Sequence, residues 1–190
     1  MEVIPIVFDL DGTLWDSTEQ IAECWSKEFS VTVEKIQSLM GKPFSEIASA
    51  LGVSAKELER LQEIEVLYLE THPGKLYSGV VPTLRTLAKE GYPLYLVSNC
   101  QSGYIEVFMR SSNVSDLFCD YLCEGDTKLS KQEMLRLLKQ KHNFVNPVYV
   151  GDTLPDKEAS KQAGYRFIGV SYGFGNLYGL TDFVELLDLV

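Results

Sequence analysis

Residues 6–14 read Ile-Val-Phe-Asp-Leu-Asp-Gly-Thr-Leu, so an apolar run ends in two closely spaced aspartates followed by a Gly-Thr pair. Such a run is typical of a buried strand in an α/β protein. Open α/β sheets bind their ligands just beyond the carboxyl ends of the strands. The sequence therefore predicts that Asp9 and Asp11 face a ligand-binding crevice.

A second acidic pair, Asp152 and Asp156, follows the apolar residues 148–150. Two acidic pairs facing one crevice repel each other unless a cation lies between them. Ligand sets made only of oxygen favour a hard cation such as Mg²⁺. We expect Asp152 to bind Mg²⁺ directly and Asp156 to bind it directly or through water. Asp156 equally suits the start of a helix, where its charge would offset the dipole.

Apolar segments alternate with helical patterns along most of the chain. Helix-start signals include the capping box that begins at Ser130 and the sequence Thr153-Leu154-Pro155. Strands alternating with helices predict a mostly parallel sheet with right-handed crossover connections. The expected strands are residues 3–9, 93–98, 120–123, 147–151 and 166–170.

Residues 16–79 interrupt the alternation, because they carry helix signals without a good strand candidate. The predicted fold class is α/β, with a three-layer, Rossmann-like parallel-sheet core and an inserted all-helical region. The core would comprise residues 1–15 and 80–190, and the insertion residues 16–79. Helix starts are expected at Ser17, Pro43 and Ser54 and, after the insertion, at Pro82.

Composition restricts the class of partner. A formal net charge of -10 and a pI near 4.7 argue against binding to nucleic acid or to an anionic membrane. Apolar runs fall short of the ~20 residues that span a bilayer, and the first residues lack the basic segment of a signal peptide. The four cysteines lie in apolar segments without a disulfide pattern, which favours reduced, buried thiols in a cytoplasmic protein.

Four short motifs occur in order along the chain: Asp-x-Asp-Gly-Thr at residues 9–13, Ser98 after an apolar run, Lys131 at a helix start, and the pair Asp152 and Asp156. In these motifs the chain resembles the haloacid dehalogenase superfamily, and within it the phosphoglycolate-phosphatase-like subfamily. The resemblance extends over essentially the whole chain. It implies that the helical insertion is the cap that many members carry between the first and second motifs.

The first motif suits phosphoryl transfer through a covalent intermediate. Asp9 can act as a carboxylate nucleophile and form an aspartyl-phosphate, and the resemblance implies that its other oxygen binds Mg²⁺. For Asp11 the resemblance implies two roles, general acid and base through the side chain and metal ligand through the backbone carbonyl. Gly12 lets the chain turn closely around the phosphoryl group, and Thr13 completes the phosphatase form of the motif.

The remaining motifs supply donors for phosphate oxygens. Ser98 and Asn99 can donate hydrogen bonds, and Lys131 supplies a positive charge. We expect Lys131 in this role because the family lysine sits at a helix start, where the helix N-terminus also favours an anion. Lys128, three residues earlier, is the alternative.

The predicted function is that of an enzyme, a Mg²⁺-dependent phosphatase that hydrolyses a small phosphorylated metabolite. A phosphomutase of the β-phosphoglucomutase type also keeps both aspartates of the first motif. That branch uses a cap histidine shortly after the motif, whereas this chain has no histidine before His72. A non-catalytic binding protein that keeps the fold is a further alternative. The cap shows no signature that names the substrate, and the sequence leaves the oligomeric state open.

Overall fold

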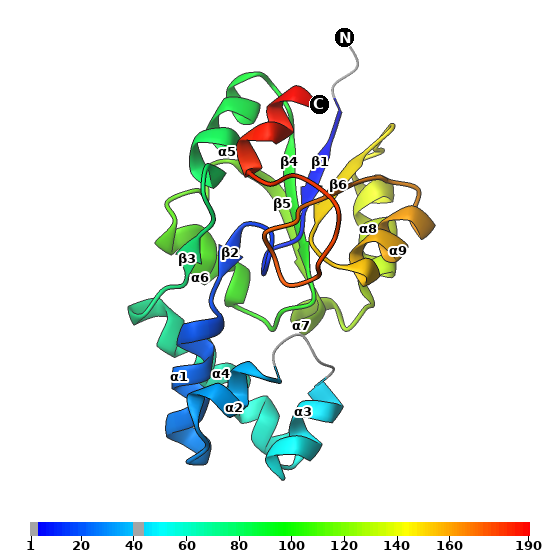
Figure 1. The fold of residues 1–190 in the computed structure, drawn as a ribbon. Helices are drawn as coiled ribbons and strands as arrows, with labels where there is room; N and C mark the ends of the chain where they lie inside the picture. The colour runs from blue at the N-terminus through cyan, green and yellow to red at the C-terminus, as the bar shows by residue number, and fades with distance from the viewer. Residues whose placement is uncertain (1–3, 40–43) are drawn as a thin grey trace. The chain divides into compact units, whose positions relative to one another are not determined.

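The computed structural model describes residues 4–39 and 44–190. Within these residues, one five-stranded parallel sheet has the order β5-β4-β1-β6-β7 (Figure 1). The predicted strands are confirmed, although β5 begins at Phe118 rather than at residue 120. The strands are β1 (Ile6–Phe8), β4 (Leu94–Ser98), β5 (Phe118–Cys123), β6 (Val148–Gly151) and β7 (Arg166–Gly169).

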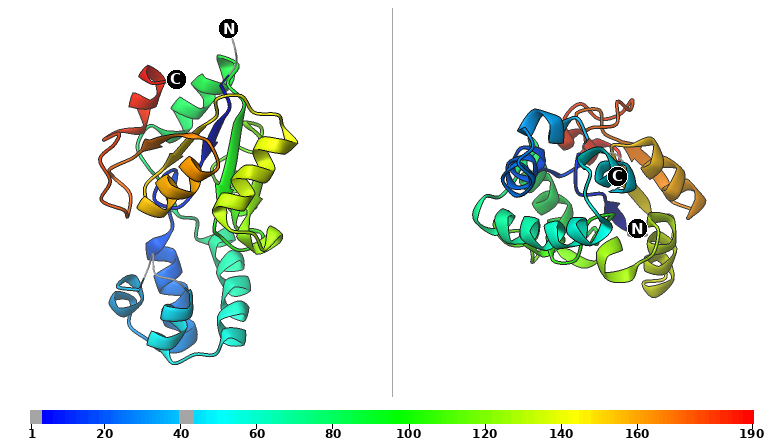
Figure 2. Two further views of the ribbon diagram at one scale, coloured as in Figure 1. Left: turned by 90° about the vertical axis from the view of Figure 1, so that its right-hand side faces the viewer. Right: turned by 90° about the horizontal axis from the view of Figure 1, so that it is seen from below.

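The sheet is covered by helices on both faces, which explains why its central strands β1, β4 and β6 are almost entirely apolar. On one face, Val7 lies beside Tyr149 and packs in a core cluster that includes Leu135. On the other face, the ring of Phe8 lies 5.8 Å from that of Phe183. Figures 1 and 2 show the resulting layers. The first face carries α8 (Lys131–Lys141) and α9 (Leu154–Gln162), and the second carries α5 (Val80–Lys89), α6 (Tyr104–Ser111) and the 3-10 helix η1 (Phe183–Asp188).

The chain forms two compact units, Met1–Trp15 together with Leu76–Val190, and Asp16–Lys75. Short strands β2 (Trp15–Asp16) and β3 (Lys75–Leu76) pair where the chain leaves and re-enters the first unit. The described part of the second unit is helical apart from its connections. Its helices are α1 (Thr18–Phe29), α2 (Val33–Gln37), α3 (Phe44–Leu51) and α4 (Ala55–Thr71).

The helical unit has an apolar interior of its own. Trp25 is 2 % exposed and packs in a cluster with Leu58 and Leu61. Its indole Nε1 donates a 2.8 Å hydrogen bond to Oε2 of buried Glu65, so the polar edge of the ring is satisfied inside the cluster. Ser54 and Glu57 form the capping box that starts α4, which confirms the predicted helix start.

The predicted start at Ser17 is confirmed in position but not in its capping hydrogen bond, and the predicted start at Pro82 is wrong. Ser17 occupies the N-cap position of α1, but its side chain makes no capping hydrogen bond. Oδ1 of Asp16 instead accepts a 3.0 Å hydrogen bond from the Thr18 amide, because the aspartate side chain is longer than that of serine. Helix α5 begins at Val80, and Pro82 lies in its first turn, where the missing proline N–H has no helical partner to lose. The predicted start at Pro43 lies outside the described residues.

None of the helices in the described part of the chain has the length and apolarity needed to cross a membrane. The cysteines are free, and three of them are buried. The expectation of burial is wrong for Cys119, which is exposed on β5.

Candidate active site

Strand register brings the two acidic pairs to the same edge of the sheet. β1 and β6 are parallel neighbours in which Phe8 pairs with Val150. The Asp9 amide donates to the Val150 carbonyl at 2.9 Å, which extends the pairing by one residue. Asp9 and Asp152 therefore follow the ends of adjacent strands, and they are 6 % and 0 % exposed.

Asp156 lies in the first turn of α9, where it completes a capping box with Thr153. Its Oδ2 accepts hydrogen bonds from the Thr153 amide at 3.0 Å and the Thr153 hydroxyl at 2.5 Å. The helix-start role weighed for this residue is thus present. Oδ1 points to Lys131, at 2.5 Å from Nζ. Each oxygen of the Asp156 carboxylate has its own partner.

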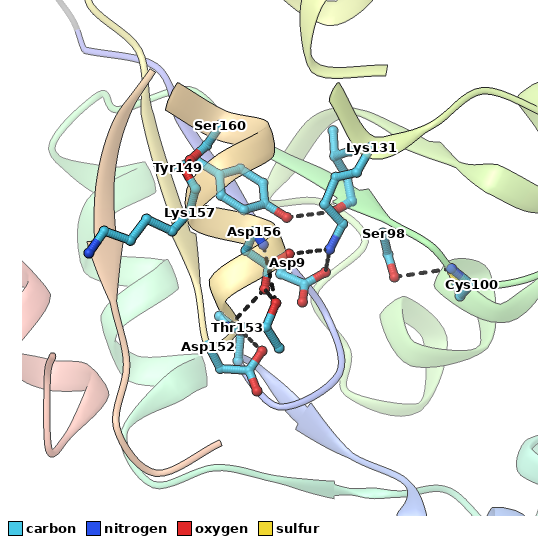
Figure 3. Close-up of polar contacts among 12 residues, drawn as sticks. Asp9, Ser98, Cys100, Lys131, Tyr149, Asp152, Thr153, Asp156, Lys157 and Ser160 are labelled. Carbon is cyan, nitrogen blue, oxygen red and sulfur yellow. Dashed lines mark hydrogen bonds and ion pairs between the residues drawn. The ribbon is translucent and has the colours of Figure 1, made fainter. Parts of the chain in front are cut away.

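Lys131 connects the two acidic pairs (Figure 3). It is the first residue of α8, after a capping box formed by Ser130 and Glu133, so its helix starts where the sequence predicts. Its Nζ lies 2.8 Å from Oδ1 of Asp9 and 2.5 Å from Oδ1 of Asp156, and its side chain is 10 % exposed. Lys128, the alternative lysine, is exposed and follows the short helix α7 (Glu124–Thr127).

Burial and charge act against each other in this cluster. Burial raises the pKa of Asp9 well above its usual value, the Asp156 carboxylate raises it further, and Lys131 opposes both effects. Burial alone would lower the pKa of Lys131, but Asp9, Tyr149 and Asp156 carry it well above its usual value. Lys131 is therefore charged, and its ammonium group only partly offsets the effect of burial on the pKa of Asp9.

The cluster has the composition of a site for a hard cation. One carboxylate oxygen from each of Asp9, Asp152 and Asp156 lies within 4.8 Å of the others, and all three residues are buried. Among the described residues, the three carboxylates share one buried ammonium group, that of Lys131, which leaves excess negative charge in a poorly solvated place. The donors are all oxygen, which suits Mg²⁺. The side chain of Asp11 is not part of this group.

The turn after β1 fits tightly against Asp152. Gly12 has a φ of +80°, and a methyl group on its Cα would lie 2.3 Å from Oδ2 of Asp152. The Thr13 side chain is fully buried, and its hydroxyl lies 3.5 Å from Oδ1 of Asp152. Glycine is needed here both for the left-handed backbone and for the close approach.

The carboxylate of Asp11 meets Tyr104, a residue that the sequence analysis missed. The Tyr104 hydroxyl donates a 2.8 Å hydrogen bond to Oδ1 of Asp11. Tyr104 starts α6, and its ring is 1 % exposed and packs against Trp15. Its position in an ordinary amphipathic helix gives no sequence signal of contact with a residue of the first motif.

Ser98 and Asn99 differ in exposure. Ser98 ends β4, the strand next to β1, and is 3 % exposed. Its Oγ accepts a 3.3 Å hydrogen bond from the Cys100 amide, which leaves its own hydroxyl hydrogen for another acceptor. Asn99 is exposed. The neighbouring strand ends thus bring Ser98, but not the predicted Asn99, into a buried setting beside the acidic edge.

The loop after β7 also reaches the site and was missed. The Phe174 amide donates to Oδ2 of Asp152 at 2.7 Å, and the Tyr172 hydroxyl donates to the Thr13 carbonyl at 2.8 Å. A hydrogen bond from a backbone amide cannot be predicted from residue type. The glycines at 173 and 175 could, however, have indicated a close approach of two chain segments.

Comparison with known proteins identifies the family. The family model for haloacid dehalogenase-like hydrolases matches residues 6–170. The chain belongs to this family. Residues 6–170 include every motif residue of the candidate site, and the family shows the chain to be a hydrolase with a Rossmann-like core.

Individual members of the haloacid dehalogenase-like family give more detail. A phosphoglycolate phosphatase of Photobacterium profundum is 28% identical over 219 residues, which cover 97% of this chain and 94% of the relative. The structure of a predicted phosphoglycolate phosphatase from Haemophilus somnus superposes with a TM-score of 0.81 at 20% identity, covering 100% and 98% of the two chains. A protein from Thermotoga maritima, assigned provisionally as a β-phosphoglucomutase, superposes with a TM-score of 0.76 at 21% identity, covering 100% and 98%. At such identities the two structural matches bear on the fold alone.

Proposed function

We propose that the protein is a Mg²⁺-dependent phosphatase that hydrolyses a small phosphate monoester through an aspartyl-phosphate on Asp9. The observation that carries the proposal is the bridge from Lys131 to Asp9 and Asp156 inside a buried cluster of carboxylates. Phosphoryl transfer needs a positioned nucleophile and positive charge beside the phosphoryl oxygens. In this cluster Asp9 is the candidate nucleophile, and the ammonium group of Lys131 supplies the positive charge.

Asp9 and Asp152 would hold Mg²⁺ directly. Asp156 would bind the ion directly or through water. Both oxygens of Asp156 already have protein partners, which favours the water-mediated contact. Family resemblance adds the backbone carbonyl of Asp11 as a further ligand. When bound, the ion would neutralise negative charge on the phosphoryl oxygens and on the carboxylates.

The chain's own residues would perform the first transfer. A carboxylate oxygen of Asp9 attacks phosphorus, and the bond from phosphorus to the ester oxygen breaks. Lys131 holds a phosphoryl oxygen with its ammonium group, and the Ser98 hydroxyl donates to another. The departing oxygen takes a proton from Asp11 and leaves as an alcohol.

The second transfer restores the enzyme. Asp11, now ionised, accepts a proton from water while the water oxygen attacks phosphorus. The bond from Asp9 to phosphorus breaks, which releases inorganic phosphate and returns both aspartates to their starting states. Asp9 is 6 % exposed, so few water molecules would reach the intermediate.

The unit Asp16–Lys75 would act as the cap and the other unit as the catalytic core. A helical cap restricts substrates to small molecules, and the net charge of -10 disfavours polyanions such as nucleic acid. Phosphoglycolate is the first substrate to test, because relatives named phosphoglycolate phosphatase match nearly the whole chain. A cytoplasmic location stays a prediction.

Phosphate release tests the proposal. Phosphoglycolate, p-nitrophenyl phosphate and a panel of sugar phosphates, nucleotides and small phosphorylated acids are supplied with Mg²⁺ or with EDTA. We expect Mg²⁺-dependent release from at least one small monoester. Transfer of phosphate to a second hydroxyl of a sugar phosphate, without release, would favour the mutase alternative. Absence of both reactions, together with ligand binding, would favour a binding protein.

A further inference from the structure

The loop after β7 packs against Asp152 so closely that only glycine fits at two positions. A methyl group on Gly175 would lie 2.0 Å from the Asp152 carbonyl oxygen. A methyl group on Gly173 would lie 2.5 Å from Cβ of Asp152 and 2.2 Å from the carbonyl oxygen of Gly12. Neither glycine has a positive φ, so the requirement is for space rather than for an unusual backbone conformation. The loop therefore touches Asp152 on its backbone and its side chain.

Hydrogen bonds attach the same loop to the metal-binding edge. The Phe174 amide, between the two glycines, donates to Oδ2 of Asp152 at 2.7 Å. The Tyr172 hydroxyl donates to the Thr13 carbonyl at 2.8 Å, and the Thr13 hydroxyl lies 3.5 Å from Oδ1 of Asp152. One oxygen of the carboxylate is thus held by a short backbone bond, and the other keeps acceptor capacity for a cation.

We propose that residues 172–175 are a positioning element that orients the Asp152 carboxylate for Mg²⁺ and thereby sets the affinity of the site. The inference deepens the proposed function and rests on its metal site. A fixed carboxylate loses little rotamer freedom when it binds a cation, and a backbone donor holds it more rigidly than a mobile side chain does. Loss of such a supporting contact typically weakens metal binding by about 10–100-fold.

Three alanine variants of the full chain test the proposal. Gly173→Ala and Gly175→Ala push the loop away from Asp152. Gly179→Ala is the matched control. Gly179 follows β7 in the same loop, its φ is likewise not positive, and its methyl group would lie 1.9 Å from the carbonyl oxygen of Gly169 rather than against Asp152. Calorimetric titration with MgCl₂ gives the dissociation constant, and thermal unfolding in EDTA gives the stability of each variant. We expect Gly173→Ala and Gly175→Ala to bind Mg²⁺ about 10–100-fold more weakly than the parent. The dissociation constant of Gly179→Ala should change by less than about threefold, although all three variants lose a similar amount of stability.

The outcomes separate the two proposals. A parent protein that does not bind Mg²⁺ overturns the proposed function and this inference with it. If the parent binds Mg²⁺, two results overturn the positioning role alone. In one, Gly173→Ala and Gly175→Ala bind Mg²⁺ as tightly as the parent. In the other, all three variants bind it equally more weakly.

A measurement on the unaltered protein covers the case in which the variants do not fold. With ¹⁵N-labelled phenylalanine, the amide of Phe174 is one of nine signals. We expect it to be protected from hydrogen exchange and to shift on addition of Mg²⁺, while Phe144, which precedes the amino end of β6, does not shift. Rapid exchange of the Phe174 amide, or no response to Mg²⁺ at concentrations where the protein binds it, contradicts the proposal.

Discussion

Lys131 binds Oδ1 of Asp9 at 2.8 Å, across a separation of 122 residues in the sequence. Both side chains are nearly buried, so the contact joins an ammonium group and a carboxylate in a poorly solvated place. Such a pair places an ammonium group directly against the proposed nucleophile, and it gives the site a specific electrostatic arrangement that mutation can test.

Replacement of Lys131 by methionine should lower kcat/KM by about 100–1,000-fold, because a buried donor to the transferring phosphoryl group is lost. Unfolding in EDTA should become easier by about 3–5 kcal/mol, since the carboxylates lose their partner. Steady-state kinetics and denaturant titration measure the two effects. Lys128→Met is the control, because Lys128 is exposed, and it should behave like the parent. A larger loss of activity in Lys128→Met than in Lys131→Met would exchange the roles of the two lysines.

The two aspartates after β6 should differ in their effect on Mg²⁺. Asp152→Ala should raise the Mg²⁺ concentration for half-maximal activity sharply, because it removes a direct ligand. Asp156→Ala should raise it less, and it should lower the stability because the capping box of α9 and the ion pair with Lys131 are both lost. Activity as a function of MgCl₂ concentration compares them. Parent-like Mg²⁺ dependence in both variants would mean that the second acidic pair is structural.

The metal-free protein should lose stability through Asp9 as pH rises. Burial, followed by the neighbouring Asp156, raises the pKa of Asp9 in the folded protein above its ordinary value of 3.8. Between these two pKa values the folded state binds more protons than the unfolded state, so its stability falls as pH increases. The contribution is fully present below pH 3.8 and is lost by the pH at which folded Asp9 ionises.

Unfolding free energies of the parent and Asp9→Asn, measured in EDTA across this range, report the effect, because the variant lacks the carboxyl group that titrates. We expect Asp9→Asn to gain stability relative to the parent as pH rises, and Mg²⁺ to stabilise the parent more at pH 7 than at pH 5, because the ion displaces protons from the carboxylates. A difference between the two proteins that does not change with pH would contradict the raised pKa.

The proposed cap should make the enzyme selective for small substrates. We expect kcat/KM for the best low-molecular-weight monoester to exceed that for phosphopeptides and oligonucleotide ends by a wide margin. Replacing residues 16–75 by a short Gly/Ser loop should weaken the discrimination among small substrates before it removes the chemistry. Phosphopeptides or oligonucleotide ends that match the best metabolite would contradict the role of the helical unit.

Local sequence signals predicted much of the fold. Continuous apolar runs identified the central strands β1, β4 and β6, because strands buried on both faces need no polar alternation. Capping boxes identified the starts of α4 and α8, because their hydrogen bonds span three residues and are visible in the sequence. Ser17 marked the start of α1 correctly, but Asp16, one residue earlier, accepts a hydrogen bond from the Thr18 amide, and the Ser17 side chain makes no capping bond.

The site could be predicted where function depends on residue type, and not where it depends on tertiary contact. Asp9 and Asp152 follow strand ends, so register alone brings them together. The hydrogen bond from Tyr104 to Asp11 joins residues 93 positions apart, and the bond from Phe174 to Asp152 uses a backbone amide. Neither contact follows from spacing or composition, because each depends on how a helix or loop packs on the finished sheet.

The most direct test of the account is detection of phosphate covalently bound to Asp9. The enzyme is mixed with excess substrate and Mg²⁺, quenched in acid within milliseconds, digested and analysed by mass spectrometry. We predict a phosphoryl group on the peptide that contains Asp9 in the parent and neither this adduct nor turnover in Asp9→Asn. Phosphate release without the adduct, or Mg²⁺-dependent turnover that persists in Asp9→Asn, would contradict the nucleophilic role of Asp9.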